Sequence, residues 1–405
     1  MVSPRNLRRR VTVFAAVAGL LIAASFFLMS APALAQTQGS QTSAPPQQET
    51  PPEAGGPQGS TSPIAVPKKK EEPPPPPKPK VKNPEGLGDY SLQVSVPLVN
   101  VPVLVTTHGG EFIPGLQKDN FRVTEDGVPQ KITNFQQAEA PITAVLLVEF
   151  ASTNYSFIYD MLNNAYGFAQ SLKPQDWVAV ISYDMRPEIQ QDFTQDKSRV
   201  VAALNHLRIP GFSETNLFDA LYDTLDRLER VQGRKYVILI STGCDSFSKL
   251  NYDQVLKKVK GTRDITIYAV SVGQALRLYA ESHGLTRYLH CTGGMQTEST
   301  AQLDFLQADN QMSTFAKMTG GKVYLPRFAG EVRDIVGDIS NSIRNEYEIS
   351  YHSTNPKLDG TFRKIKVELV DAQTGGPIRM NVNGKPEKKY NIIARDGYTA
   401  KREVE

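Results

Sequence analysis

Four nearly continuous apolar runs constrain this chain most, because each alternates with a segment of helical period. Runs of this kind are typical of parallel strands that helices cover on both faces. A strand followed by a helix, repeated along residues 141–345, predicts a doubly wound α/β domain with a mostly parallel sheet. The expected strands are Ala144–Glu149, Trp177–Ser182, Tyr236–Ser241 and Ile265–Val272, and the expected helices are Phe157–Leu172, Val200–Leu207, Leu217–Leu228, Tyr252–Val259 and Glu331–Arg344.

Shorter β-rich runs flank this domain on both sides, in residues 89–140 and in residues 346–405. Neither flank is long enough to bury a core alone. We therefore expect the two flanks to pack together as one small β-sandwich, into which the domain of residues 141–345 is inserted. The Asp126-Gly127 pair also predicts a hairpin, and its expected strands are Phe121–Thr124 and Lys131–Thr133.

Residues 1–35 read as an export signal. A basic start is followed by the 19-residue apolar run Val11–Met29 and by Ala33-Leu34-Ala35, a pattern that signal peptidase accepts. The run is long enough to remain in a membrane, so a cleaved signal peptide and a retained signal anchor are both open. In either case the rest of the chain is expected outside the cytoplasm, in the periplasm, at the cell surface or secreted.

Residues 36–88 predict a disordered spacer. They hold 14 of the 28 prolines and no aromatic residue, so they cannot form a core.

The net charge and the absence of several catalytic and metal-binding motifs argue against some classes of function. The net charge is +3, and removing Arg5, Arg8, Arg9 and Arg10 of the export signal leaves −1, so the body lacks the basic field of a nucleic-acid-binding protein. The 405 residues contain no CxxC, HExxH, GxSxG or P-loop motif. We therefore expect a protein that is not an enzyme and does not bind nucleic acid, and that touches a membrane only through an uncleaved anchor.

Five segments of the central domain follow one another in a characteristic order and spacing: Val145–Glu149, Trp177–Ile181, Thr215–Leu221, Val237–Gly243 and Ile267–Gly273. They resemble a von Willebrand factor A-type (VWA) domain. Further segments flank them: Val99–Val101, Phe121–Gly127, Asn355–Val367 and Arg395–Tyr398. With these flanks, the chain resembles the exported VWFA-related family known chiefly from Acidobacteria. This resemblance implies adhesion or protein–protein contact at the carboxyl edge of the sheet.

The resemblance also implies a divalent cation at that edge, held by a DxSxS loop, a threonine and an aspartate. In this chain the loop carries Glu149, Ala151 and Thr153 at the three ligand positions. Thr215 matches the threonine, but Thr242 stands where the family has its aspartate. Because Mg²⁺ demands a near-ideal octahedral shell of oxygens, we expect a degenerate site and no cofactor.

Two alternatives remain open at this position. Mg²⁺ would bind only if Asp245 replaced the missing acid, with Glu149, Thr153, Thr215 and Asp245 as its ligands. Otherwise Glu149 is an end-of-strand acid that is hydrogen-bonded to the hydroxyls of Thr153, Thr215 or Thr242.

The two cysteines, Cys244 and Cys291, both follow expected strands on the carboxyl side. Connections that leave parallel strands at the same edge lie close together, and an exported protein meets an oxidising compartment. The sequence therefore predicts a Cys244–Cys291 disulfide.

We expect a metal-independent surface for a protein partner of unknown identity. The stretch Gln274–Asp304 reads as a long irregular connection at the carboxyl edge, and its apolar and aromatic side chains suggest either an interaction surface or a cover for the loop itself. The alternative function is an envelope enzyme or enzyme accessory that uses Cys291, His283 or His290. The expected binding residues are Glu149, Thr153, Thr215, Thr242, Asp245, Tyr279, Arg287 and Tyr288.

Overall fold

The computed structural model describes residues 98–401, except 138–139, 153–154, 208–210, 287–290, 292–297, 379, 383–384 and 388. The export signal and the spacer expected from the sequence lie outside these residues. Among the helices that are described, none is both long and apolar enough to cross a membrane.

A six-stranded, mostly parallel sheet forms the centre of the α/β domain. The strand order is β10-β9-β8-β5-β6-β7, and only β7 runs antiparallel to its neighbour. This arrangement confirms the predicted fold class. The strands are β5 (Thr143–Glu149), β6 (Trp177–Tyr183), β7 (Pro187–Thr194), β8 (Lys235–Ser241), β9 (Ile265–Ser271) and β10 (Val323–Tyr324).

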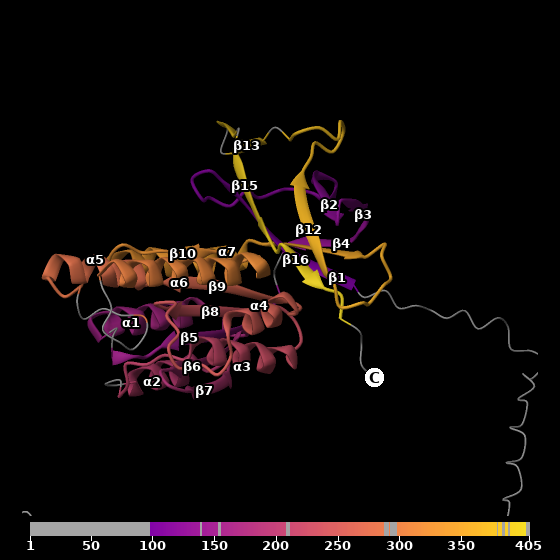
Figure 1. Ribbon diagram of the computed structural model, residues 1–405. Helices are drawn as coiled ribbons and strands as arrows, with labels where there is room; N and C mark the ends of the chain where they lie inside the picture. The colour runs from indigo at the N-terminus through magenta and orange to yellow at the C-terminus, as the bar shows by residue number, and fades with distance from the viewer. Residues whose placement is uncertain are drawn as a thin grey trace, which may run out of the picture. The chain divides into compact units, whose positions relative to one another are not determined.

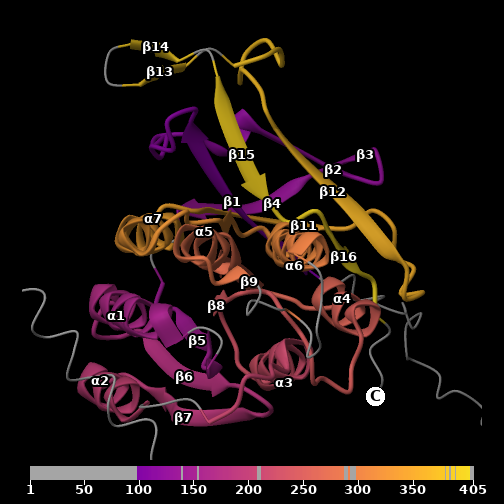
Figure 2. The same ribbon diagram turned by 60° about the vertical axis from the view of Figure 1, so that its left-hand side comes forward.

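Helices cover both faces of this sheet, as Figures 1 and 2 show. One apolar core contains side chains of α1, α2, α5 and α7, the other contains side chains of α3 and α4, and α6 contributes to both. The helices are α1 (Tyr155–Ser171), α2 (Lys197–His206), α3 (Leu217–Glu229), α4 (Tyr252–Lys260), α5 (Gly273–His283), α6 (Glu298–Thr319) and α7 (Val332–Arg344), with 3₁₀ turns η1 (Lys118–Asn120) and η4 (Ala329–Glu331).

The flanking segments form two four-stranded sheets that share one apolar core. Each sheet mixes strands from both flanks: β1 pairs with β11, and β2 pairs with β12 (Figure 2). One sheet is β15 (Tyr390–Ala394), β1 (Leu98–Thr107), β11 (Tyr347–His352) and β4 (Ile132–Gln137); the other is β16 (Gly397–Thr399), β12 (Phe362–Leu369), β2 (Phe121–Glu125) and β3 (Val128–Gln130); β13 (Met380–Val382) and β14 (Lys385–Glu387) form a separate hairpin.

The hairpin at Asp126-Gly127 has a different second strand from the one that the sequence suggested. Both residues have positive φ, 48° and 84°, as a tight hairpin turn requires. β2 pairs with the short strand β3, which begins directly after Gly127. The expected partner segment, Lys131–Thr133, instead leads into β4 of the opposite sheet.

The stretch Gln274–Asp304 is not a long irregular loop, and this prediction was wrong. α5 occupies its first third, and α6 begins at Glu298. Gly273 opens α5 one residue beyond the end of β9, with Val272 between them, and Gly284 closes the helix in the left-handed conformation with φ of 67°.

A buried carboxyl group lies where α7 passes into β11. Glu346 accepts hydrogen bonds from the hydroxyls of Tyr236 on β8, at 2.7 Å, and Tyr268 on β9, at 3.0 Å. Burial raises the pKa of Glu346 to about 7. Glu346 thus ties the start of β11 to the central strands β8 and β9.

Candidate functional site

The carboxyl ends of β5, β8 and β9 meet at one edge of the sheet, and Glu149 is the last residue of β5. Its side chain is 1% exposed. Oε2 accepts hydrogen bonds from Ser241 Oγ at 2.6 Å and from the Thr242 backbone N–H at 2.8 Å. Thr242 Oγ1 also donates to the same carboxylate, at 2.9 Å from Oε2 and 3.0 Å from Oε1. The end of β8 therefore holds the Glu149 carboxylate in place.

A hydrogen-bond relay extends from this carboxylate to Tyr183 at the end of β6. The Tyr183 hydroxyl donates to Ser241 Oγ at 2.8 Å, and the Gly243 N–H donates to the same oxygen at 2.8 Å. Burial, and then the negative charge of Glu149, raise the pKa of Tyr183, so its hydroxyl remains a donor. Gly243 has φ of 79°, and a Cβ there would lie only 3.0 Å from the side chains of Ala308 and Met312, so this tight turn requires glycine.

Thr215 and Asp245 lie at the same edge but are engaged elsewhere. Thr215 Oγ1 donates to the carbonyl oxygen of Cys244 at 2.8 Å. Asp245 Oδ1 accepts from the Phe218 N–H at 3.1 Å and from Ser248 Oγ at 2.6 Å, so it caps the first turn of α3. Burial raises the pKa of Asp245.

The expected magnesium ligands that the structure describes are engaged by other groups. Both oxygens of the Glu149 carboxylate already accept hydrogen bonds, Ala151 has no donor atom, and Asp245 is held at α3. In the described ranges, no group of three or more His, Cys, Asp or Glu side chains is arranged to hold a metal. Thr153, the remaining expected ligand, lies outside those ranges.

The predicted disulfide between Cys244 and Cys291 is confirmed, with the two Cα atoms 5.0 Å apart. The Cys244 N–H donates to Thr242 Oγ1 at 3.2 Å, which links the bridge to the Glu149 cluster. The disulfide thus ties the connection after β8 to the segment between α5 and α6.

The disulfide bears on the enzyme alternative, because Cys291 has no free thiol to act as a nucleophile. His283 lies at the end of α5, where its ring stacks on Tyr279 with the centroids 4.1 Å apart. Its Nδ1 lies 2.9 Å from the Tyr279 carbonyl oxygen. His290, Arg287 and Tyr288 lie outside the described residues.

Two exposed aromatic side chains at this edge were missed from the sequence. Phe212 is 52% exposed and Phe247 is 49% exposed. Their backbones are fixed to the edge: the Phe212 carbonyl accepts from the Ser152 N–H at 2.8 Å, and the Phe247 N–H donates to the Thr215 carbonyl at 2.9 Å. In the sequence, each is an aromatic residue in a short polar connection, Phe212 after a helix and Phe247 after a strand. That pattern could have indicated both residues as exposed.

A hollow of about 310 Å³ opens beside these loops. Phe150, Tyr183 and Gly211 contribute to its lining, together with the charged side chains of Arg186 and Glu188. Gly211, which lines the hollow, directly precedes the exposed Phe212 in the chain. The edge therefore combines exposed aromatic area with polar groups.

The doubly wound, mostly parallel sheet places this domain in the class of open α/β folds, in which ligands generally bind at the carboxyl ends of the strands. Residues 150–280 match the von Willebrand factor type A domain, and the chain therefore contains a VWA domain. No curated protein matches the chain.

Several solved structures are similar to this chain at low identity. A von Willebrand factor type A protein from Catenulispora acidiphila is 10% identical over 75% of each chain, with a TM-score of 0.37. The vWF domain of the type V pili tip protein Mfa5 from Porphyromonas gingivalis is 13% identical over 51% of this chain and 96% of that one, with a TM-score of 0.33. The three N-terminal domains of the same Mfa5 protein are 18% identical over 38% of this chain, with a TM-score of 0.25, and this chain spans only 28% of their length.

Proposed function

We propose that this chain is an exported, non-catalytic protein-binding module that acts through the carboxyl edge of its VWA sheet without a metal ion. The observation that carries this proposal is the pair of exposed aromatic rings, Phe212 and Phe247, held beside a carboxylate that is already hydrogen-bonded. Aromatic side chains dominate the energetics of protein interfaces because they bury a large area at low entropic cost.

The cluster around Glu149 acts as the rigid support of this surface. Glu149, Thr242, Thr215 and Asp245 hold the connections after β5, after β8 and before α3 in one arrangement. A surface that is ordered before binding loses less entropy when a partner docks. Tyr279, which is partly exposed on α5, extends the proposed surface, and Arg287 and Tyr288 remain expected contacts.

The test is capture of an envelope protein by the full chain, with the captured protein identified by mass spectrometry. Phe212→Ala combined with Phe247→Ala should abolish capture, while Trp177→Ala should not. Trp177 is a matched control because it is 44% exposed but begins β6, at the opposite edge of the sheet. Capture should be equal in EDTA and in Mg²⁺.

Two outcomes would contradict the proposal. In the first, EDTA abolishes capture, which would show that a metal ion mediates the contact with the partner. The other is undiminished capture by the double variant. Since both rings are exposed, the double variant should unfold within about 1 kcal/mol of the wild type.

A further inference from the structure

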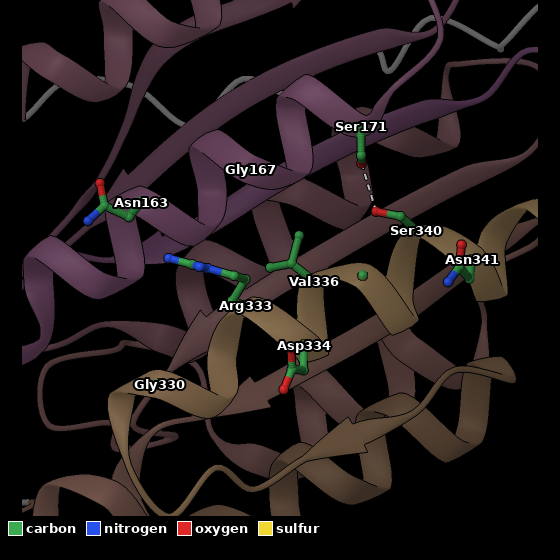
Figure 3. Close-up of a pocket in the computed structure, with 10 residues that line it drawn as sticks. Asn163, Gly167, Ser171, Gly330, Arg333, Asp334, Val336, Ser340 and Asn341 are labelled. Atoms are coloured by element: carbon green, nitrogen blue, oxygen red, sulfur yellow. Dashed lines mark hydrogen bonds between the residues drawn. The ribbon is translucent and has the colours of Figure 1, made fainter. Parts of the chain in front are cut away.

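A second site lies away from this edge, in the groove between α1 and α7 (Figure 3). The groove has a volume of about 920 Å³, at the upper end of the range typical of ligand pockets. α1 contributes Asn163, Gly167 and Ser171. α7 contributes Arg333, Asp334, Val336, Gly337, Ser340 and Asn341. The nine residues from Asn163 to Ser171 rise by eight helical steps, which give the groove a length of about 12 Å.

The floor of the groove is smooth because small residues face each other there. A Cβ at Gly167 would lie 4.0 Å from Val336 Cγ1, and a Cβ at Gly337 would meet nothing within 4 Å. The hydroxyls of Ser171 and Ser340, 2.7 Å apart, bridge the two helices (Figure 3). A ligand can therefore lie flat on the floor, but the floor offers no separate pockets for the alternating side chains of an extended peptide.

The walls carry planar polar groups that are free to bind. Within the part of the chain that the structure describes, the side chains of Asn163, Arg333 and Asn341 have no hydrogen-bond or ion-pair partner. Figure 3 shows the Arg333 side chain extending from α7 in the direction of Asn163. An amide offers two donors and an acceptor, and a guanidinium offers five donors in a fixed plane.

Exposed aromatic rings stand along the rim. Tyr159 is 70% exposed and lies one helical turn before Asn163, and Tyr166 follows on the same face of α1. Phe328, which precedes η4, is 59% exposed. Its ring lies close to Gly330, a lining residue: a Cβ added at Gly330 would be 3.2 Å from the ring. Rings of this kind present apolar faces to a ligand.

We propose that the α1–α7 groove binds a short, uncharged oligosaccharide. A sugar chain has hydroxyls along its edges, which match the amide and guanidinium groups of the walls. Its rings also have apolar faces, which match the aromatic rim. Its flat rings need no side pockets, in agreement with the smooth floor. This site is separate from the edge that carries the proposed protein contact.

Calorimetric titration of the full chain with cellotetraose, chitotetraose and maltotetraose tests this proposal. At least one of the three should bind with one site per chain. Gly337→Leu should abolish binding because the new side chain fills the groove. Arg333→Ala should weaken binding about tenfold, the loss expected for one charge-assisted hydrogen bond.

The variants have built-in controls. Leucine has a higher helix propensity than glycine, so Gly337→Leu should fold at least as stably as the wild type. Arg230→Ala, which removes an exposed arginine at the end of α3, should leave sugar binding unchanged. The Phe212→Ala and Phe247→Ala changes should also leave it unchanged, so failure of this proposal and failure of the protein-binding proposal are distinguishable.

The proposal is overturned if none of the three tetrasaccharides binds, or if binding persists in Gly337→Leu. A tetraproline peptide is titrated in parallel. If the peptide binds, no sugar binds and Gly337→Leu removes the peptide binding, the groove is a site for an extended peptide instead.

Discussion

At the scale of single residues, Glu149 is the central hydrogen-bond acceptor at the carboxyl edge of the VWA sheet. Its carboxylate accepts three hydrogen bonds from Ser241 and Thr242 in a buried position. Glu149→Ala would leave these donors without their acceptor, so we expect it to lower the free energy of unfolding by about 3 kcal/mol.

Urea unfolding measures this difference. Glu188→Ala is the control, because Glu188 is half-exposed and its ion pair with Arg186 lies on the surface, where such pairs contribute less than about 1 kcal/mol. Equal midpoints for the two variants would contradict a supporting role for Glu149.

Glu346 predicts a specific dependence of stability on pH. Burial raises its pKa from an ordinary 4.5 to about 7, although the hydroxyls of Tyr236 and Tyr268 and the nearby Arg234 oppose this shift. Between these pH values the folded protein holds a proton that the unfolded chain has released, so the stability contributed by Glu346 falls as pH rises through that window.

Glu346→Gln removes this titration. Between pH 4.5 and 8, the wild type should lose up to roughly 3 kcal/mol of unfolding free energy relative to the variant, as the size of the pKa shift requires. Denaturant unfolding at several pH values checks this, and parallel pH profiles for the two proteins would refute it.

At the scale of elements, the disulfide fixes the segment between α5 and α6. Cys244 and Cys291 are 47 residues apart, and closing a loop of this length stabilises the fold by roughly 4 kcal/mol in the chain-entropy model. Changing both cysteines to serine should lower the melting temperature markedly. A melting temperature within one degree of the wild type, measured by calorimetry under non-reducing conditions, would contradict this.

The central strands could be predicted from the sequence because they are buried on both faces. β5, β8 and β9 are apolar at nearly every position, and their observed bounds differ from the predicted ones by one residue. β7 was missed because Pro187–Thr194 is an edge strand with one buried residue, so it lacks both an apolar run and a clean alternation. Tertiary contacts, rather than local sequence, define such a strand.

The candidate site was only partly predictable for a similar reason. The position of Glu149 at a strand end and the disulfide follow from topology, since both depend on which strand ends share an edge. The orientation of Asp245 toward Phe218 depends on the path of one loop. Likewise, the exposure of Phe212 and Phe247 is a property of the folded surface, which residue type alone does not reveal.

At the scale of the whole molecule, the sandwich depends on both ends of the chain. β1 lies between β15 and β11, both of which come from the C-terminal flank. Deleting residues 347–405 should therefore expose the apolar faces of β1 and β2 and make the remaining protein aggregate. A soluble, cooperatively folded protein after this deletion, assayed by size exclusion and calorimetry, would show that the α/β domain does not need the sandwich.

The central claim is that the carboxyl edge of this VWA domain works without a metal ion. The most direct test is the melting temperature of the full chain in EDTA, in Mg²⁺ and in Ca²⁺. We expect the same value in all three, because the Glu149 carboxylate is occupied by hydrogen bonds and Asp245 by α3. A metal at 100 times its Kd would add about 2.7 kcal/mol of stability. A rise in melting temperature with either cation, abolished by Thr215→Ala, would contradict the account.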